Sequence, residues 1–166
     1  QANPIFYVSS SPWNLYDMLT DFFDINDIPA GPLMLRDWGI KPSELLPFGH
    51  KTHKLDSITG IMDAYPDLPF VLIGDSGQED PEIYTTLVSK YPSRIKAIYI
   101  RDVSDNARDA EIAKLREEVA KVNCPFLLVK DTLAAANHAA KLGLIEPSDV
   151  DTVCQRQLED LDKPIM

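Results

Sequence analysis

Short apolar runs alternate along the chain with longer segments in which apolar residues recur every three or four positions. We expect strands at the apolar runs, which are Ile5–Val8, Leu33–Leu35, Phe70–Ile73, Ile95–Ile100 and Phe126–Val129. The periodic segments predict helices at residues 12–26, 54–65, 80–91, 107–122, 132–142 and 148–161. This alternation is typical of an α/β fold, with a mostly parallel, Rossmann-like sheet and helices on both faces.

Composition narrows the class of protein. A chain of 166 residues is expected to form a single domain, and 16 basic against 26 acidic residues give a net charge of −10, which argues against nucleic-acid binding.

The two cysteines do not make a disulfide framework, and Cys124 beside an apolar run is expected to be a buried thiol. His50 and His53 resemble half of a metal site, but a third ligand is missing, so zinc is not expected. Without a membrane-spanning run or a signal peptide, a cytoplasmic protein with at most peripheral membrane contact is expected.

The third apolar run delivers a carboxylate to the end of a strand. Gly74 and Gly77 allow a sharp turn around Asp75, and Asp80 with Pro81 is typical of a helix N-cap followed by the first helical residue. Ligands bind at the carboxyl edge of parallel sheets, and carboxylates there suit a hard cation such as Mg²⁺. The alternative interpretation is that Asp75 only forms a turn and Asp80 only caps the helix.

Polar residues also follow the first apolar run and begin the second helix. Ser9 could donate a hydrogen bond to a phosphate oxygen, or it could be a turn residue; Ser11 is expected to cap the first helix. Lys54 could reach the same site as a point charge, although a lysine in this position is usually a solvated surface group.

Several segments together resemble a known family. The most specific is Leu72-Ile-Gly-Asp-Ser-Gly-Gln78 with Asp80-Pro-Glu-Ile-Tyr84, and the others are Phe6-Tyr-Val-Ser9-x-Ser-Pro-Trp13, Leu33-x-Leu-Arg-Asp37, His53-Lys54-Leu55 and Ile98-Tyr-Ile-Arg-Asp-Val103. They resemble the catalytic domain of the actin-patch-associated phosphatidate phosphatases, in the haloacid-dehalogenase superfamily and distantly similar to the lipins. The resemblance runs from about residue 5 to Ile145. It implies a Mg²⁺-dependent phosphatase acting on a phosphomonoester, with phosphatidate as one possible substrate.

The resemblance also implies roles for individual residues. Ser9 matches the hydroxyl that holds the transferring phosphoryl group, and Lys54 matches the cation that balances its charge. Asp75 matches the Mg²⁺ ligand of the fourth motif and Asp80 the second acid of that motif. These roles agree with phosphoryl transfer in general, which depends on cations around the equatorial oxygens.

Three further residues belong to the matching segments. Arg36 and Asp37 match a family segment to which the resemblance assigns no role. We nevertheless include Arg36, with Ser10 beside the matched serine, among the expected substrate-binding residues.

The sequence departs from the family at the nucleophile. The superfamily carries an Asp-x-Asp-x-Thr/Val motif on a strand that precedes the serine motif, and only four residues precede Ile5. Formal matches at Asp149–Val153 and Asp160–Asp162 follow no apolar strand, and Ser148 as a helix N-cap explains the first of them better. We therefore expect this chain to be the body of such a phosphatase without its N-terminal segment, and inactive in isolation.

The sheet is expected to have a central vacancy at the position of that strand, between Ile5–Val8 and Phe70–Ile73. Three outcomes are open: the two half-sheets pair directly, a segment of another chain fills the gap, or the gap stays visible.

Two other functions remain open. A naturally inactive relative would be a non-catalytic Mg²⁺- and phosphate-binding domain. Gly74-Asp-Ser76 also resembles the nucleophile motif of some serine esterases, but the Asp-x-x-His that those need is missing, because Ala135 lies three residues before His138.

Overall fold

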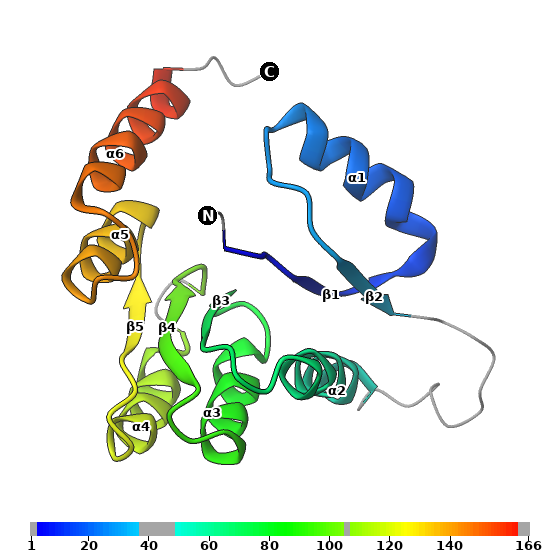
Figure 1. Ribbon diagram of the computed structural model, residues 1–166, viewed down its shortest axis with the longest axis vertical. Coiled ribbons are helices and arrows are strands. Elements are labelled where there is room, and N and C mark those ends of the chain that lie inside the picture. Colours follow the sequence, from blue (N-terminus) through cyan, green and yellow to red (C-terminus); the bar gives the residue numbers. More distant parts are fainter. Residues whose placement is uncertain (1–2, 37–48, 105–106, 163–166) are drawn as a thin grey trace. The chain divides into compact units, whose positions relative to one another are not determined.

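The computed structural model describes residues 3–36, 49–104 and 107–162, and it divides into two compact units, Gln1–Leu68 and Pro69–Met166. Both units combine parallel strands with helices (Figure 1). The predicted α/β, Rossmann-like class is confirmed. No helix among the described residues has the length and apolar character needed to cross a bilayer.

In the first unit, two parallel strands form a small sheet. The elements are β1 (Tyr7–Pro12), a short 3₁₀ helix η1 (Trp13–Leu15), α1 (Tyr16–Ile25), β2 (Leu33–Arg36) and α2 (Gly49–Ala64). Strand β1 pairs with β2, and α2 packs against β1. The Tyr7 ring contacts Phe23 of α1 with 4.6 Å between centroids, and this contact holds α1 to the sheet.

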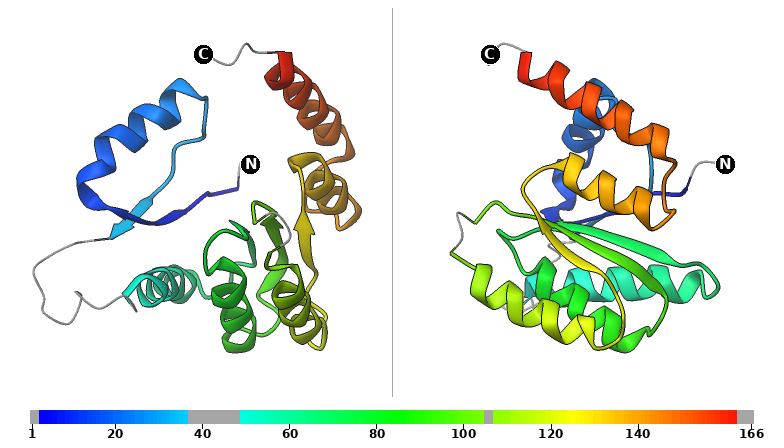
Figure 2. Two further views of the ribbon diagram at one scale, coloured as in Figure 1. Left: turned by 180° about the vertical axis from the view of Figure 1, so that it is seen from behind. Right: turned by 90° about the vertical axis from the view of Figure 1, so that its left-hand side faces the viewer.

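The second unit is a three-stranded parallel sheet with helices on both faces. Its elements are β3 (Phe70–Asp75), α3 (Asp80–Lys90), β4 (Ile95–Arg101), α4 (Asp109–Ala120), β5 (Phe126–Val129), α5 (Thr132–Lys141) and α6 (Pro147–Asp162). The strand order is β3-β4-β5. Helices α3 and α4 cover one face and α5 covers the other, with α6 packed on α5 (Figure 2).

The core of the second unit follows from the alternation of side chains along β4. Ala97 and Tyr99 pack with Ala139 of α5, while Ile98 and Ile100 are fully buried on the opposite face. Strand β3 lies at the edge of this sheet, and the side chain of Ile73 is 74% exposed. The predicted role of Cys124 is also confirmed, because its thiol is buried and burial raises its pKa.

Three predicted boundaries in the first unit are wrong, and one of them is the start of α2, which lies at Gly49 rather than at residue 54. Strand β1 begins at Tyr7 rather than Ile5 and continues through the serines to Pro12. The first α-helix begins only at Tyr16, and Ser11 lies in β1, so it does not cap a helix. The pairing steps from Val8–Met34 to Pro12–Arg36, so β1 has two more residues than β2 in this interval. Such a bulge lets the strand accommodate polar residues that resemble a turn in the sequence.

The described strands belong to two sheets, one in each unit. The sheets have the orders β1-β2 and β3-β4-β5, as predicted for the two halves. The strand expected between the halves stays a prediction, as does the expectation of a single domain.

Candidate functional site

The turn after β3 brings Asp75 and Asp80 together at the carboxyl edge of the sheet. Strand β3 ends at Asp75, whose Oδ1 accepts a hydrogen bond of 2.8 Å from the backbone N–H of Gly77. The side chain of Asp80 turns back, and its Oδ2 accepts the backbone N–H of Asp75 at 3.3 Å. One carboxylate therefore closes the turn and the other fixes the strand end.

The predicted role of Asp80 as a helix cap is wrong. Helix α3 begins at Asp80 itself, Glu79 occupies the N-cap position, and no side chain caps the helix there. Asp80 is 4% exposed and hydrogen-bonds to the preceding strand instead. Pro81 is the second residue of the helix, one position later than predicted but still in its first turn.

Gly74 is required for this arrangement. A Cβ atom at residue 74 would lie 2.6 Å from Asp80 Oδ2 and 2.8 Å from Asp80 Cβ, closer than van der Waals contact allows. The aspartate side chain therefore occupies the space that a larger residue would need. The sequence suggested a glycine for a sharp turn, whereas the structure uses it for close packing.

Tyr84 of α3 holds the strand that leads into the turn. Its hydroxyl donates a hydrogen bond of 2.8 Å to the carbonyl oxygen of Ile73, two residues before Asp75. Burial raises the pKa of Tyr84 far above its usual value, and the Asp80 and Asp75 carboxylates raise it further. The ring therefore stays neutral and keeps donating at any pH near neutrality.

Ser76 connects the turn to the end of β4. It is completely buried, and its hydroxyl donates to Asp102 Oδ1 at 3.2 Å. Ser76 Oγ also accepts a hydrogen bond of 2.8 Å from the backbone N–H of Val103. This arrangement argues against the esterase interpretation, because a nucleophilic serine must be accessible and paired with a base. Asp102, which the sequence left without a role, holds this serine.

Arg101 is the residue of β4 that pairs with Asp75 in the parallel ladder. Its side chain is exposed, and it has no hydrogen bond or ion pair with any residue in the described part of the chain. The carboxyl edge therefore presents a guanidinium on the strand next to the carboxylate of Asp75.

The remaining predicted site residues lie in the first unit, on its two strands and on α2. Ser9 and Ser10 lie in the bulged part of β1, where Ser9 Oγ accepts the backbone N–H of Ser11 at 3.1 Å and contacts Ser11 Oγ at 3.0 Å. Arg36 ends β2 and is 6% exposed. Lys54 lies one turn inside α2 and is 9% exposed. The interpretation of Lys54 as a solvated surface group is therefore wrong.

The weaker sequence signals do not form a site in the described residues. Asp37 and the His50 side chain lie outside them, and within them no group of three His, Cys, Asp or Glu residues could hold a metal ion. The formal Asp-x-Asp matches both lie in α6. This helix begins at Pro147, so Ser148 is not its N-cap as predicted; the backbone N–H of Glu146 instead donates to Asp149 Oδ2.

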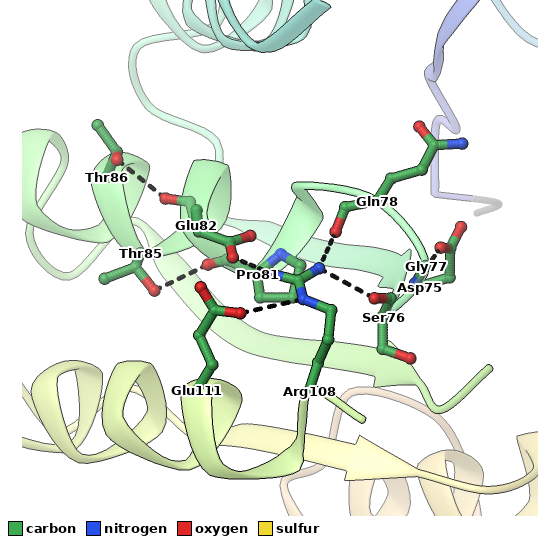
Figure 3. A network of polar contacts seen from close by, with 10 residues as sticks. All are labelled: Asp75, Ser76, Gly77, Gln78, Pro81, Glu82, Thr85, Thr86, Arg108 and Glu111. Carbon is green, nitrogen blue, oxygen red and sulfur yellow. Dashed lines mark hydrogen bonds and ion pairs between the residues drawn. The ribbon is translucent and has the colours of Figure 1, made fainter. Parts of the chain in front are cut away.

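Arg108 is a residue of this region that sequence reasoning missed. It occupies the N-cap position of α4, and its guanidinium contacts the turn between Asp75 and Asp80 (Figure 3). Nothing in the sequence distinguishes it from the other charged residues at the start of that helix.

Comparison with known proteins points to one family. The family model for the catalytic domain of phosphatidate phosphatase APP1 matches residues 1–102. Phosphatidate phosphatase APP1 of Saccharomyces cerevisiae is 35% identical over 104 residues, which are 63% of this chain and 18% of that protein. An uncharacterized protein of Schizosaccharomyces pombe is 34% identical over 101 residues, or 60% of this chain and 16% of its own length. The match thus spans less than a fifth of either relative. No solved structure matches the chain.

Proposed function

The chain belongs to the family of the phosphatidate phosphatase APP1 catalytic domain, and we propose that the protein it represents is a Mg²⁺-dependent phosphatase. The substrate would be a phosphomonoester, with phosphatidate as the first compound to test because a relative is named for it. The observation that carries this proposal is the pair of carboxylates at the carboxyl edge of β3, where Asp80 fixes the strand end that bears Asp75.

The donor chemistry of the turn suits Mg²⁺. Asp75 Oδ1 accepts one hydrogen bond, from Gly77, whereas its second oxygen has no hydrogen-bond partner among the described residues. Mg²⁺ commonly binds through one or two carboxylates and completes its shell with waters and substrate phosphate, so a large cluster of acids is not needed. Asp75 would be the ligand and Asp80 would orient it. When bound, the ion would neutralise negative charge on the phosphoryl oxygens.

The other matched residues would act on the phosphoryl group. Ser9 would donate its hydroxyl hydrogen to a phosphoryl oxygen, and Lys54 would supply a positive charge from a buried position. Ser10 and Arg36 remain substrate-binding candidates, and Arg101 would add a cation beside Asp75. The phosphoryl acceptor would be an aspartate outside these 166 residues, forming an aspartyl-phosphate that water hydrolyses.

A second proposal is a non-catalytic domain that binds Mg²⁺ and phosphate. It is favoured by one observation, that both Asp-x-Asp matches of this sequence lie in a helix rather than at the end of a described strand. Such a domain would keep the Asp75 site and transfer no phosphoryl group.

Hydrolysis and metal binding by the intact protein test these proposals together. We expect Mg²⁺-dependent release of phosphate from phosphatidate or from p-nitrophenyl phosphate, and its loss in Asp75→Asn. Asp131→Asn is a matched control, because Asp131 follows β5, which lies beyond β4 in the same sheet, but caps α5 through Ala134, a role that asparagine fills as well. Mg²⁺ binding without hydrolysis would favour the non-catalytic domain. Hydrolysis that persists in EDTA and in Asp75→Asn would refute the metal assignment.

A further inference from the structure

Arg108 joins three structural elements around the turn that carries Asp75. Its guanidinium donates to the carbonyl oxygens of Ser76, at 3.0 Å, and of Gln78 (Figure 3). It also forms ion pairs with Glu82 in the first turn of α3 and with Glu111 of α4, the latter at 3.1 Å. One side chain thus holds the turn, α3 and α4 together.

These contacts fix the backbone on both sides of Gly77. Ser76 and Gln78 are the residues immediately before and after it, and the backbone N–H of Gly77 is the group that holds Asp75 Oδ1. If both neighbouring carbonyls are held by one rigid guanidinium, the Gly77 N–H keeps its direction toward the carboxylate. The position of the Asp75 side chain therefore depends on Arg108 through a single intervening peptide.

The ion pair with Glu82 holds the Arg108 side chain in place. Arg108 is only 24% exposed, and the Glu82 carboxylate that pairs with it is 19% exposed, so both charges are partly withdrawn from water. A charge that is partly withdrawn from water needs an opposite charge beside it. Removing either Arg108 or Glu82 would leave the other without that compensation and destabilise the structure. Arg108 is consequently held in place from the side opposite the turn.

We propose that Arg108 is a positioning residue that sets the metal affinity of Asp75 by fixing the turn from Ser76 to Gln78. The proposal rests on the proposed function, in which Asp75 is the Mg²⁺ ligand. Arg108 itself would touch neither the ion nor the substrate. Lysine cannot replace it fully, because the contacts use three separate guanidinium nitrogens in a planar fork.

Calorimetric titration of the full chain with Mg²⁺ alone tests this role. Outer-shell partners typically contribute about 10–100-fold to metal affinity, so we expect a weakening of this size in Arg108→Ala and a smaller one in Arg108→Lys. Arg116→Ala is the matched control, since Arg116 is an exposed arginine of the same helix and should leave the affinity unchanged. Hydrogen exchange of the Gly77 amide should accelerate in Arg108→Ala, while amides of α5 keep their rates.

The two measurements separate the failure of this proposal from the failure of the proposed function. If the unaltered chain does not bind Mg²⁺, the metal assignment falls, and the Gly77 exchange rate alone decides whether Arg108 fixes the turn. If Arg108→Ala does not fold, Arg108→Lys and Glu82→Gln provide the same comparison. An unchanged Gly77 exchange rate, or Mg²⁺ affinity within twofold of the unaltered chain, would overturn the positioning role.

Discussion

Asp80 Oδ2 accepts the backbone N–H of Asp75 at 3.3 Å, so the first residue of α3 fixes the last residue of β3. The two carboxylates therefore have different surroundings. Asp80 is buried and committed to the backbone, whereas Asp75 is partly accessible and retains an oxygen for a ligand. These different surroundings suit the proposed roles, in which Asp75 binds the metal ion and Asp80 orients Asp75.

Gly74→Ala should disrupt this relationship. The new methyl group would meet Asp80 Oδ2 at 2.6 Å, so either Asp80 or β3 has to move. Overpacking of this kind costs about 1–3 kcal/mol, and we expect that loss in the free energy of unfolding together with loss of Mg²⁺ binding. Denaturant unfolding and Mg²⁺ titration measure the two effects.

Gly60→Ala is the control for this substitution. Gly60 lies inside α2, and nothing lies within 4 Å of a Cβ built there. Alanine in a helix interior is favoured over glycine by about 0.5–1 kcal/mol, so this variant should be slightly more stable. If Gly74→Ala matched Gly60→Ala in stability and bound Mg²⁺ normally, the packing argument would be wrong.

Lys54→Met should slow phosphoryl transfer in the intact enzyme. Methionine keeps most of the buried apolar volume and removes the charge, and loss of one preorganised group typically costs about 10²–10³ in rate. Lys141→Met, at an exposed position of α5, should leave the rate unchanged. Steady-state hydrolysis measures the rates of both variants. Equal rates would mean that the charge of Lys54 does not contribute to phosphoryl transfer.

Ser9→Ala and Ser11→Ala form a matched pair. Both substitutions remove the contact between the two hydroxyls, but only the first removes the hydroxyl assigned to the phosphoryl group. We expect Ser9→Ala to lose about 10²-fold in rate and Ser11→Ala to stay near the unaltered enzyme. Equal losses would mean that the bulge, rather than the Ser9 hydroxyl, determines activity.

The raised pKa of Tyr84 predicts that the protein loses stability at high pH. Its folded-state pKa is raised above the unfolded value of about 10, so the folded protein holds the proton that the unfolded chain releases. The contribution is fully present below pH 10, and the free energy of unfolding should fall by about 1.4 kcal/mol per pH unit above it. Burial raises the pKa of Tyr99 and Cys124 as well, and these add smaller losses of the same sign.

Tyr84→Phe checks this assignment by unfolding at several pH values. The variant leaves the Ile73 carbonyl without its donor, which should cost about 1–3 kcal/mol at pH 7. Its stability should then fall less steeply above pH 10 than that of the unaltered chain. Parallel curves for the two proteins would show that another group titrates.

The sequence predicted the order and type of the elements because each has local signals. Apolar runs mark β3, β4 and β5, and their predicted starts coincide with those of the structure. The family resemblance pointed to the segment of Asp75 and Asp80, which the structure brings into contact. Signals of this kind lie within a few residues of one another, so a linear pattern contains them.

Other features depend on contacts between distant segments and could not be predicted. Three consecutive serines resemble a turn, and only pairing with β2 shows that β1 continues through them. The burial of Lys54 depends on how α2 packs, which the position of a lysine in the sequence does not reveal. Arg108 meets Ser76 across 32 positions in sequence, and no spacing rule connects those residues.

The exposed edge of β3 has a consequence for handling the polypeptide. Among the described strands, one side of β3 has no ladder partner within its sheet, and Ile73 is largely exposed. Side chains of α3 hold two backbone groups of this strand, the Ile73 carbonyl and the Asp75 N–H, and leave the rest of that edge without a strand partner within the sheet. Unpaired, uncharged edge strands act as templates for intermolecular pairing. Within the second unit, this edge should therefore favour self-association as concentration rises, and Ile73→Lys should oppose it in the concentrated samples that crystallisation or magnetic resonance requires.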